Sequence, residues 1–259
     1  MFTHHASRIK RTPDGRVLLN LGCGAVTHPA WNNLDFGPYA TLKRRPIVAI
    51  AVKLLGLMNA ERRQRLAEVD PEIIAWDVRK PLPLPAETCD VVYHSNLIEH
   101  LTRTSASLLI QECFRILKRG GILRVVTPDT ELLATEYLRS LAAVSAGASG
   151  AVQVHEETLN RLFEQMVRDE GMGCRSLSRP VRILENCLRG DAGSRGERHL
   201  WCYDRASLAR LLDATGFVDM RILSPSESAI DDWRSFHLDV DGEGAVRSRR
   251  CLYVEAVKK

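Results

Sequence analysis

The sequence lacks the features that define several specialised classes of protein. Its seven cysteines are scattered and form neither a CxxC pair nor a zinc-ligand spacing. No apolar run reaches the length of a membrane span, and the first residues do not have the pattern of a signal peptide. The net charge of +4 is small and the basic residues are spread out, whereas nucleic-acid binders concentrate theirs on one face. We therefore expect reduced thiols and a cytoplasmic location, and the charge distribution argues against a nucleic-acid partner.

What remains is ordinary material for a globular protein. Of the 259 residues, 45% are hydrophobic and 26% are charged. This length suits one α/β domain with insertions, and it is enough to bury a substantial core. We therefore treat residues 1–259 as a single domain.

The most informative stretch of the chain spans residues 17–35. Residues 17–21 form a short apolar run, typical of a buried strand, which ends on Gly22-Cys23-Gly24. The two glycines allow positive φ and a close approach of the backbone to a ligand. A second apolar-to-acidic junction follows at Leu34-Asp35. Because nucleotide-like ligands bind at the carboxyl ends of parallel strands, we predict an adenosine ligand whose ribose hydroxyls donate to Asp35.

The spacing within this stretch argues against a dinucleotide. The dinucleotide fingerprint has a third glycine three residues after the second, and an acid about twenty residues further on. Here Thr27 takes the third position, and only thirteen residues separate Gly22 from Asp35. A pyrophosphate needs a helix N-terminus close by, whereas a sulfonium that carries methionine needs less room. A dehydrogenase of the dinucleotide-binding type is therefore disfavoured.

The rest of the chain alternates strand-like and helix-like segments. A helix is expected at 102–118, with Leu108, Leu109, Cys113, Ile116 and Leu117 on one face and a stop at Gly120-Gly121. Further helices are expected at 129–170, with a break near 146–150, and at 204–214. Besides the strand ending at Asp35, strands are expected at 17–21, 73–76, 90–93, 122–126, 219–223 and 251–257. This alternation predicts an α/β fold with a doubly wound sheet and an antiparallel pair at its end.

Three motifs resemble those of a known family. They are VLLNLGCG at 17–24, CDVVYHSNLIEHL at 89–101 and ILKRGGILRVVTPD at 116–129. In this order they resemble the class I S-adenosylmethionine-dependent methyltransferases of the type 11 kind, well over residues 17–129 and moderately over 199–257. The resemblance implies S-adenosyl-L-methionine as the cofactor. It also implies a mostly parallel seven-stranded sheet in the order 3-2-1-4-5-7-6.

The resemblance further implies roles for residues at the carboxyl ends of the strands. Asp77, after the third strand, would contact the adenine amino group, with Val78 beside the ring. His94, after the fourth strand, would lie near the methyl group. The cofactor-binding residues expected in this way are Gly22, Cys23, Gly24, Asp35, Phe36, Asp77, Val78, His94 and Ser95.

His94 is also the candidate for a catalytic general base. Methyl transfer needs a base only if the acceptor is a hydroxyl whose proton must leave, and a histidine can titrate near neutrality. The alternative is a histidine held by backbone hydrogen bonds. His199, Trp201 and Tyr203 form a second cluster, suited either to lining an acceptor pocket or to packing in the core.

No metal site is expected. Some quinone-pathway O-methyltransferases of this fold have Glu-x-x-Glu-His after the fourth strand, a pattern linked to metal binding. Here Asn96, Glu99 and His100 take those places, and spacings of three and four would put them on one helical face. An amide is a poor replacement for a carboxylate on a hard cation, and the sequence shows no other ligand cluster. We therefore expect activity without a divalent ion.

The sequence leaves the methyl acceptor open. Our leading hypothesis is a small-molecule or glycan hydroxyl, and the alternative is N-methylation or modification of an RNA or protein. The family usually has an acid where Asn20 stands and often a glycine where Val26 stands. These departures also leave open a non-catalytic scaffold that keeps the fold and binds the cofactor.

Two segments extend the expected fold. Residues 40–66 place an apolar stretch between basic residues, which predicts a helical lid over the acceptor. Contact of residues 43–65 with a membrane interface is the alternative. Residues 130–198 are expected to form an excursion of helix and loop, rich in Gly, Ser and Arg from residue 171 onwards.

Overall fold

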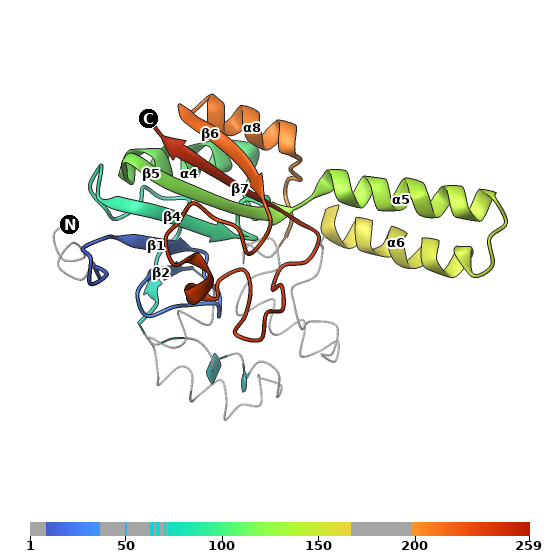
Figure 1. Cartoon of the computed structure of the whole chain (residues 1–259), viewed down its shortest axis with the longest axis horizontal. Coiled ribbons are helices and arrows are strands. Elements are labelled where there is room, and N and C mark those ends of the chain that lie inside the picture. Colours follow the sequence, from blue (N-terminus) through green and yellow to red (C-terminus); the bar gives the residue numbers. More distant parts are fainter. Residues whose placement is uncertain are drawn as a thin grey trace.

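A seven-stranded sheet forms the centre of the molecule (Figure 1). The structure is a computed structural model and describes residues 9–36, 50, 63–64, 66–67, 70, 72–166 and 198–259. The strands are β1 (Leu18–Leu21), β2 (Asn32–Asp35), β3 (Ile74–Ala75), β4 (Cys89–Ser95), β5 (Leu117–Pro128), β6 (Phe217–Leu223) and β7 (Cys251–Lys258). Their order is β3-β2-β1-β4-β5-β7-β6. β1 to β5 are parallel and β7 runs antiparallel between β5 and β6, so the predicted fold is confirmed.

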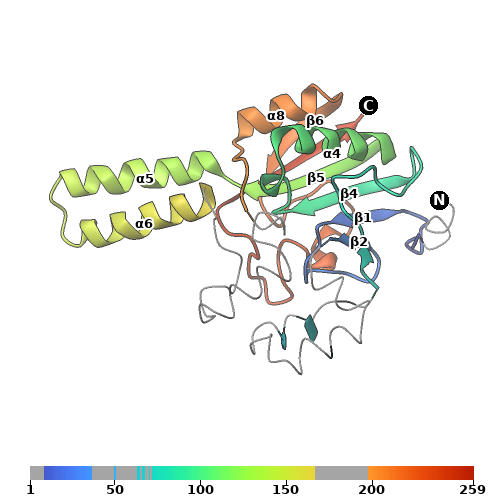
Figure 2. The ribbon, with the colours of Figure 1, turned by 180° about the vertical axis from the view of Figure 1, so that it is seen from behind.

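Two helices cover one face of this sheet (Figure 2). α4 (Arg103–Ile116) begins after Thr102, whose side chain accepts a hydrogen bond from the Ser105 N–H. α8 (Arg205–Asp213) begins after Asp204, which forms a reciprocal capping box with Ser207. Both starting points agree with the sequence-based prediction, because a Thr or Asp before an apolar helical pattern supplies the acceptor that the first N–H groups need.

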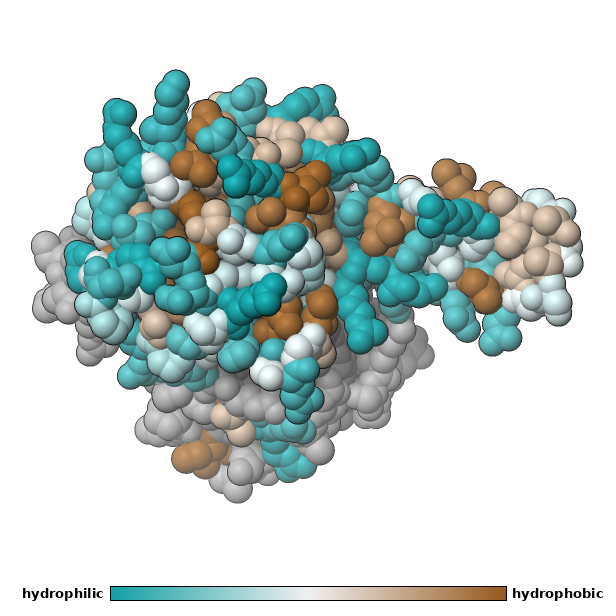
Figure 3. All heavy atoms as spheres, viewed as in Figure 1, coloured by the Kyte–Doolittle hydropathy of each residue, from teal (hydrophilic) through white to brown (hydrophobic). Residues whose placement is uncertain are grey.

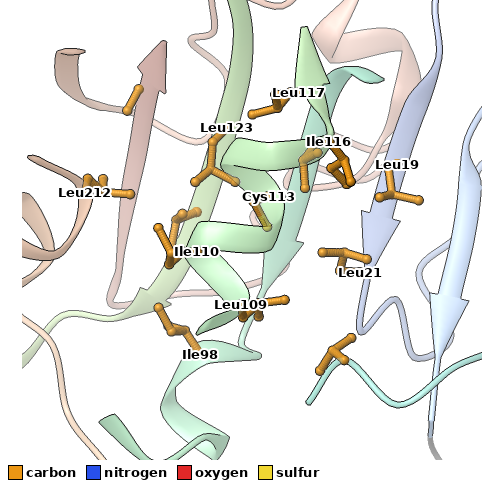
Figure 4. Packing of buried hydrophobic residues seen from close by; sticks show 14 of the residues in the cluster. Leu19, Leu21, Ile98, Leu109, Ile110, Cys113, Ile116, Leu117, Leu123 and Leu212 are labelled. Atoms are coloured by element: carbon orange, nitrogen blue, oxygen red, sulfur yellow. The ribbon is translucent and has the colours of Figure 1, made fainter. Parts of the chain in front are cut away.

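The core between these helices and the sheet is apolar (Figure 4). Ile110 and Cys113 of α4 have no exposed surface, and they pack together with Leu19, Leu21, Ile98, Leu109, Ile116, Leu117, Leu123 and Leu212. Burying each Leu or Ile side chain stabilises the fold by about 1.5–3 kcal/mol. Leu108 was expected on this face, but 53% of it is exposed on the outer side of the helix, since its neighbours already complete the buried stripe.

The opposite face of the sheet is covered by the chain between β6 and β7. This segment contains the short 3-10 helix η3 (Trp233–Phe236) and packs on the sheet through aromatic rings. Trp233 meets Trp31 and Tyr93 edge to face, and Phe236 meets Trp31 in the same way, with ring centroids 5.3–6.2 Å apart. Aromatic pairs prefer this geometry, so the segment is a fixed layer of the fold.

A buried ion-pair network fastens that layer to the sheet. Arg124 on β5 is fully buried and pairs with Asp239 at 2.8 Å and with Glu255 of β7 at 2.6 Å. The Tyr93 hydroxyl donates a hydrogen bond to Asp239 at 2.6 Å, and the Arg124 guanidinium lies over the Trp233 ring, 4.4 Å from its centroid. Buried charges are tolerated only when they are paired in this way.

A helical hairpin projects from the sheet (Figures 1 and 2). It consists of α5 (Thr130–Ser145) and α6 (Ala151–Met166), and the turn between them falls at 146–150, as predicted. Gly147 and Gly150 take positive φ in this turn. Several apolar side chains are more than half exposed on the hairpin (Figure 3), namely Leu138, Val152, Val154 and Phe163.

Several element boundaries differ from the expected ones, and two of them show the same cause. β4 runs to Ser95 instead of ending at Tyr93, because His94 and Ser95 continue to pair with β5. α4 ends at Ile116 instead of at Gly120-Gly121, because the next residue already belongs to β5 and pairs with the start of β4. In both places, pairing with a neighbouring strand overrides the local sequence signal.

Candidate active site

The carboxyl ends of β1, β2 and β4 lie side by side. Leu21, the last residue of β1, is in register with Leu34 of β2 and with His94 of β4. The segments that leave these strands therefore share one edge of the sheet. They carry most of the residues for which the sequence predicted a ligand role.

The turn after β1 has the geometry that its glycines predict. Gly22 and Gly24 both have left-handed backbones, with φ of +62° and +54°. A Cβ on Gly22 would lie 2.8 Å from Cδ1 of Leu97, the end of a side chain that can move, so it is the positive φ that favours glycine here. No atom of the described residues lies within 4 Å of the same position on Gly24, which leaves its backbone open. Cys23 is buried, and burial raises the pKa of its thiol, which disfavours the reactive thiolate.

Asp35 holds this turn against the end of β2. Its Oδ2 accepts a hydrogen bond from the Gly24 N–H at 2.7 Å. Beside it, the Cys23 N–H donates to the Leu34 carbonyl at 3.2 Å. The structure thus brings together the glycine turn and the strand-end acid. A carboxylate offers about four lone-pair sites, so the bond to Gly24 is compatible with further bonds to a ligand.

Asn20 supports the same turn, a role that sequence reasoning missed. It is buried in β1, and its Nδ2 donates to the Val26 carbonyl at 3.0 Å and to Oδ1 of Asn33 at 3.1 Å. A carboxylate has no N–H for these two bonds. Asn20 stands where the family usually has an acid, and its amide stabilises the turn through hydrogen bonds that an acid could not donate. The signal that could have revealed it is a lone amide in an apolar strand.

Asp77, Arg79 and Phe36 gather beyond the ends of β2 and β3. The Asp77 carboxylate accepts two hydrogen bonds from Arg79, at 2.8 and 2.9 Å, and this pairing holds the pKa of Asp77 below its usual value. The Arg79 guanidinium lies over the Phe36 ring, 5.6 Å from its centroid, and Phe36 is 51% exposed. Val78 is buried in the main core, so the side chain that offers an exposed flat surface here is Phe36.

His94 lies inside β4, not after it. Its side chain is fully buried, and neither ring nitrogen has a hydrogen-bond partner among the described residues. Burial lowers the pKa of His94 from 6.5 to about 4. The expectation that it titrates near neutrality is therefore wrong, because the low-polarity surroundings disfavour the charged imidazolium. Its catalytic role stays a prediction, and so does cofactor binding by the half-buried Ser95 next to it.

Asn96, Glu99 and His100 do not share a helical face, contrary to our expectation. Asn96 forms the turn that leaves β4, with φ of +49°, and its side chain donates to Oγ of Ser248 at 2.8 Å. Glu99 and His100 belong to the short 3-10 helix η2 (Ile98–His100), which begins only after that turn. Helical spacing therefore does not apply across the three residues.

The side chains of His199, Trp201 and Tyr203 do not form one cluster, because each has different neighbours. The His199 ring meets the His100 ring edge to face, with centroids 4.7 Å apart. Trp201 is 41% exposed and lies under the Arg103 guanidinium, 4.7 Å from its ring centroid. Tyr203 is buried in the main core. Of the three, only His199 joins the polar residues that follow β4.

Residues 19–125 match the family described as "Methyltransferase domain". This part of the chain contains most of β1, all of β2 to β4, the glycine turn, the strand-end acids and most of β5. Residues 19–125 of the chain therefore carry the methyltransferase domain of this family. The family implies S-adenosylmethionine as the molecule bound at the strand ends described above.

The chain is also similar to individual proteins. One is a protein of Mycolicibacterium smegmatis named "Probable S-adenosylmethionine-dependent methyltransferase", 33% identical over 126 residues. That match covers 47% of this chain and 42% of the relative, so less than half of either protein is compared. Two solved structures are S-adenosylmethionine-dependent methyltransferases. One is from Thermotoga maritima, with 16% identity and a TM-score of 0.43, and the comparison covers 96% of this chain and 84% of that one. The other is from Archaeoglobus fulgidus, with 12% identity and a TM-score of 0.42, and the comparison covers 98% of this chain and 90% of that one.

Two of the predicted segments lie largely outside the described residues. They are the proposed lid at 40–66, apart from residues 50, 63–64 and 66, and the part of the excursion at 167–197. Within the part of the chain that the structure describes, no helix is both long and apolar enough to cross a bilayer.

Proposed function

We propose that the protein transfers the methyl group of S-adenosylmethionine to a hydroxyl group of a small molecule or a glycan. The observation that carries this proposal is the hydrogen bond from the Gly24 N–H to Asp35, which fixes a glycine turn beside a strand-end acid. In a doubly wound sheet, nucleotide-like ligands bind at this edge. The family match over the same residues supports S-adenosylmethionine as that ligand.

The cofactor-binding roles follow from the side chains at this edge. We assign Asp35 to the ribose hydroxyls, because its carboxylate can accept further hydrogen bonds beside the one from Gly24. We assign Phe36 and Asp77 to the adenine, with the Phe36 ring offering a flat surface and Asp77 accepting from the amino group. The open backbone of the glycine turn is assigned to the methionine half.

The chemistry asks mainly for positioning. S-adenosylmethionine supplies an activated methyl group, so most of the acceleration comes from holding the acceptor oxygen in line with it. We propose that the buried neutral imidazole of His94 accepts a hydrogen bond from the acceptor hydroxyl. A pKa of about 4 makes it a weak base, which favours an orienting role over complete removal of the proton.

Asp35→Ala tests the cofactor assignment. Each hydrogen bond between the carboxylate and a ribose hydroxyl should contribute about 1.5–3 kcal/mol, so we expect S-adenosylmethionine to bind at least tenfold more weakly. Isothermal titration calorimetry on the full chain measures this directly. Asp213→Ala, which removes an exposed carboxylate near the end of α8, is the matched control and should leave affinity unchanged. Equal affinity of Asp35→Ala and wild type would contradict the assignment.

Turnover separates the proposed enzyme from its alternatives. Formation of S-adenosylhomocysteine with a mixture of hydroxylated metabolites or glycans supports O-methylation. Formation only with RNA or protein would favour the N-methyltransferase alternative. Cofactor binding without turnover on any of these acceptors would favour the non-catalytic scaffold.

A further inference from the structure

Three potential metal ligands converge beside the proposed active site. One ligand atom from each of Glu99, His100 and His199 lies within 4.8 Å of the other two. Glu99 and His100 come from η2, directly after β4, and His199 comes from the segment that leads into α8. The cluster therefore contains two imidazoles and one carboxylate, from segments a hundred residues apart. Such a mixture of side chains is typical of a metal site and differs from a patch of acidic residues alone.

Each of the two histidines has one ring nitrogen bonded to a backbone carbonyl. His100 Nδ1 lies 2.9 Å from the Arg198 carbonyl oxygen, and His199 Nδ1 contacts the Gln165 carbonyl oxygen. A carbonyl oxygen can only accept, so Nδ1 donates in both rings, which leaves Nε2 as the nitrogen available to a metal. This is the arrangement of metal-binding histidines, whose second nitrogen is oriented by a carbonyl or carboxylate.

Glu99 is held at the meeting point of the two segments. Its side chain is 1% exposed, and one carboxylate oxygen accepts a hydrogen bond from the Thr127 hydroxyl at 3.3 Å. Its backbone carbonyl accepts hydrogen bonds from the N–H groups of Leu200 and Trp201, at 2.7 and 3.2 Å. These bonds tie the His199 segment to η2, so the three ligands are placed by the backbone and do not depend on chance side-chain contacts.

We propose that Glu99, His100 and His199 form a binding site for Zn²⁺. Two imidazole nitrogens and one carboxylate oxygen are a ligand set that zinc uses when it keeps a fourth position open. Magnesium and calcium prefer sites built from oxygen atoms alone.

This proposal replaces our sequence-based expectation of no metal. That expectation rested on Asn96, which stands where related enzymes have a carboxylate, and on the absence of any other ligand cluster in the sequence. The third ligand of the proposed site comes instead from His199. Asn96 points elsewhere, toward Ser248.

The proposed zinc site follows β4 directly, on the edge of the sheet that carries the proposed cofactor residues. η2 follows β4, next to the edge where β1 and β2 carry the cofactor residues, and Leu97 packs on Gly22 of the glycine turn. On the proposed function, an acceptor hydroxyl bound to Zn²⁺ releases its proton to water. Its oxygen then forms the bond to the methyl carbon as the carbon–sulfur bond breaks, which leaves S-adenosylhomocysteine. A bound zinc ion lowers the pKa of water to about 7, and it would favour ionisation of a hydroxyl in the same way.

Zinc binding can be tested without substrate or cofactor. The full chain is stripped with a chelator and titrated with Zn²⁺ in competition with a chromophoric chelator, and its metal content is checked by mass spectrometry. We expect one zinc per chain. His100→Ala and His199→Ala should each bind zinc at least tenfold more weakly. Losing a residue that merely orients a metal ligand already lowers affinity about tenfold or more, and losing the ligand itself should lower it at least as much. His237→Asn removes an exposed histidine outside the cluster and should match wild type.

The seven cysteines require a second measurement, because thiolates also bind zinc. Co²⁺ bound to the proposed site should show visible d–d absorption without a sulfur-to-metal charge-transfer band. This readout uses wild-type protein and holds even if a histidine variant fails to fold. A thiolate band, or zinc affinity that is the same in wild type and both variants, would overturn the site.

The two proposals fail separately. If zinc binds as expected but S-adenosylmethionine does not, the proposed function falls and the metal site stands. If methyl transfer proceeds at the full rate in chelated, zinc-free protein, the catalytic role of the metal falls while the cofactor assignment stands.

Discussion

Arg124→Met should lower the free energy of unfolding by about 3–5 kcal/mol. Arg124 is fully buried and is the cation paired with both Asp239 and Glu255. Methionine fills similar space but leaves two carboxylates in the interior without their positive partner, and breaking a buried pair in this way has costs of this size. Urea unfolding followed by circular dichroism measures the change.

An exposed ion pair supplies the matched control. Arg205 on α8 pairs with Glu131 at 2.8 Å, and both side chains are about half exposed. Arg205→Met makes the same chemical change on the surface, where such pairs contribute about 0–1 kcal/mol. A similar loss of stability in the two variants would contradict the view that burial makes the Arg124 network costly to break.

His94→Leu should remove a large part of the loss of stability at acidic pH. The pKa of His94 is lowered by burial to about 4 in the folded state, against 6.5 for an ordinary histidine. Between pH 4 and 6.5, His94 is protonated in the unfolded chain and neutral in the folded protein. The free energy of unfolding is therefore unaffected by His94 above pH 6.5, and it decreases as the pH falls from 6.5 to 4. The difference amounts to about 3 kcal/mol. Leucine fills similar space and does not titrate.

Urea unfolding at several pH values between 4 and 7 gives the comparison. Wild type should show the full acid slope and His94→Leu a flatter one. If His94→Leu keeps the full slope of wild type, the imidazole is not responsible for it. The observation would then argue that the imidazole finds a hydrogen-bond partner in the folded protein.

The sequence predicted the sheet well because its strands and turns have local signals. Apolar runs ending on glycine or aspartate placed β1 and β2, and a Thr or Asp before a helical pattern placed the starts of α4 and α8. The ends of elements were less accurate where pairing decided them. His94 and Ser95 are polar and suggested a loop, yet both are held in β4 by the strand beside them.

The site was predicted only where its residues are close in sequence. The Gly24 and Asp35 pair lies within one strand-turn-strand unit, so spacing was enough to bring the two together. His199 lies a hundred residues from Glu99, and nothing local indicates that their backbones are hydrogen-bonded. The burial of His94, which decides its pKa, likewise depends on packing that no single stretch of sequence specifies.

The position of β7 has a consequence for synthesis on the ribosome. β7 is the strand between β5 and β6, and it supplies the hydrogen bonds on which β6 depends for its place in the sheet. While residues 217–250 are emerging, β5 therefore presents an open edge, and β6 has no strand to join. The nascent sheet cannot close until residue 258 has left the exit tunnel. A chain held on the ribosome before β7 has emerged would present unpaired strand edges on β5 and β6, the kind of surface on which chains aggregate and to which chaperones bind.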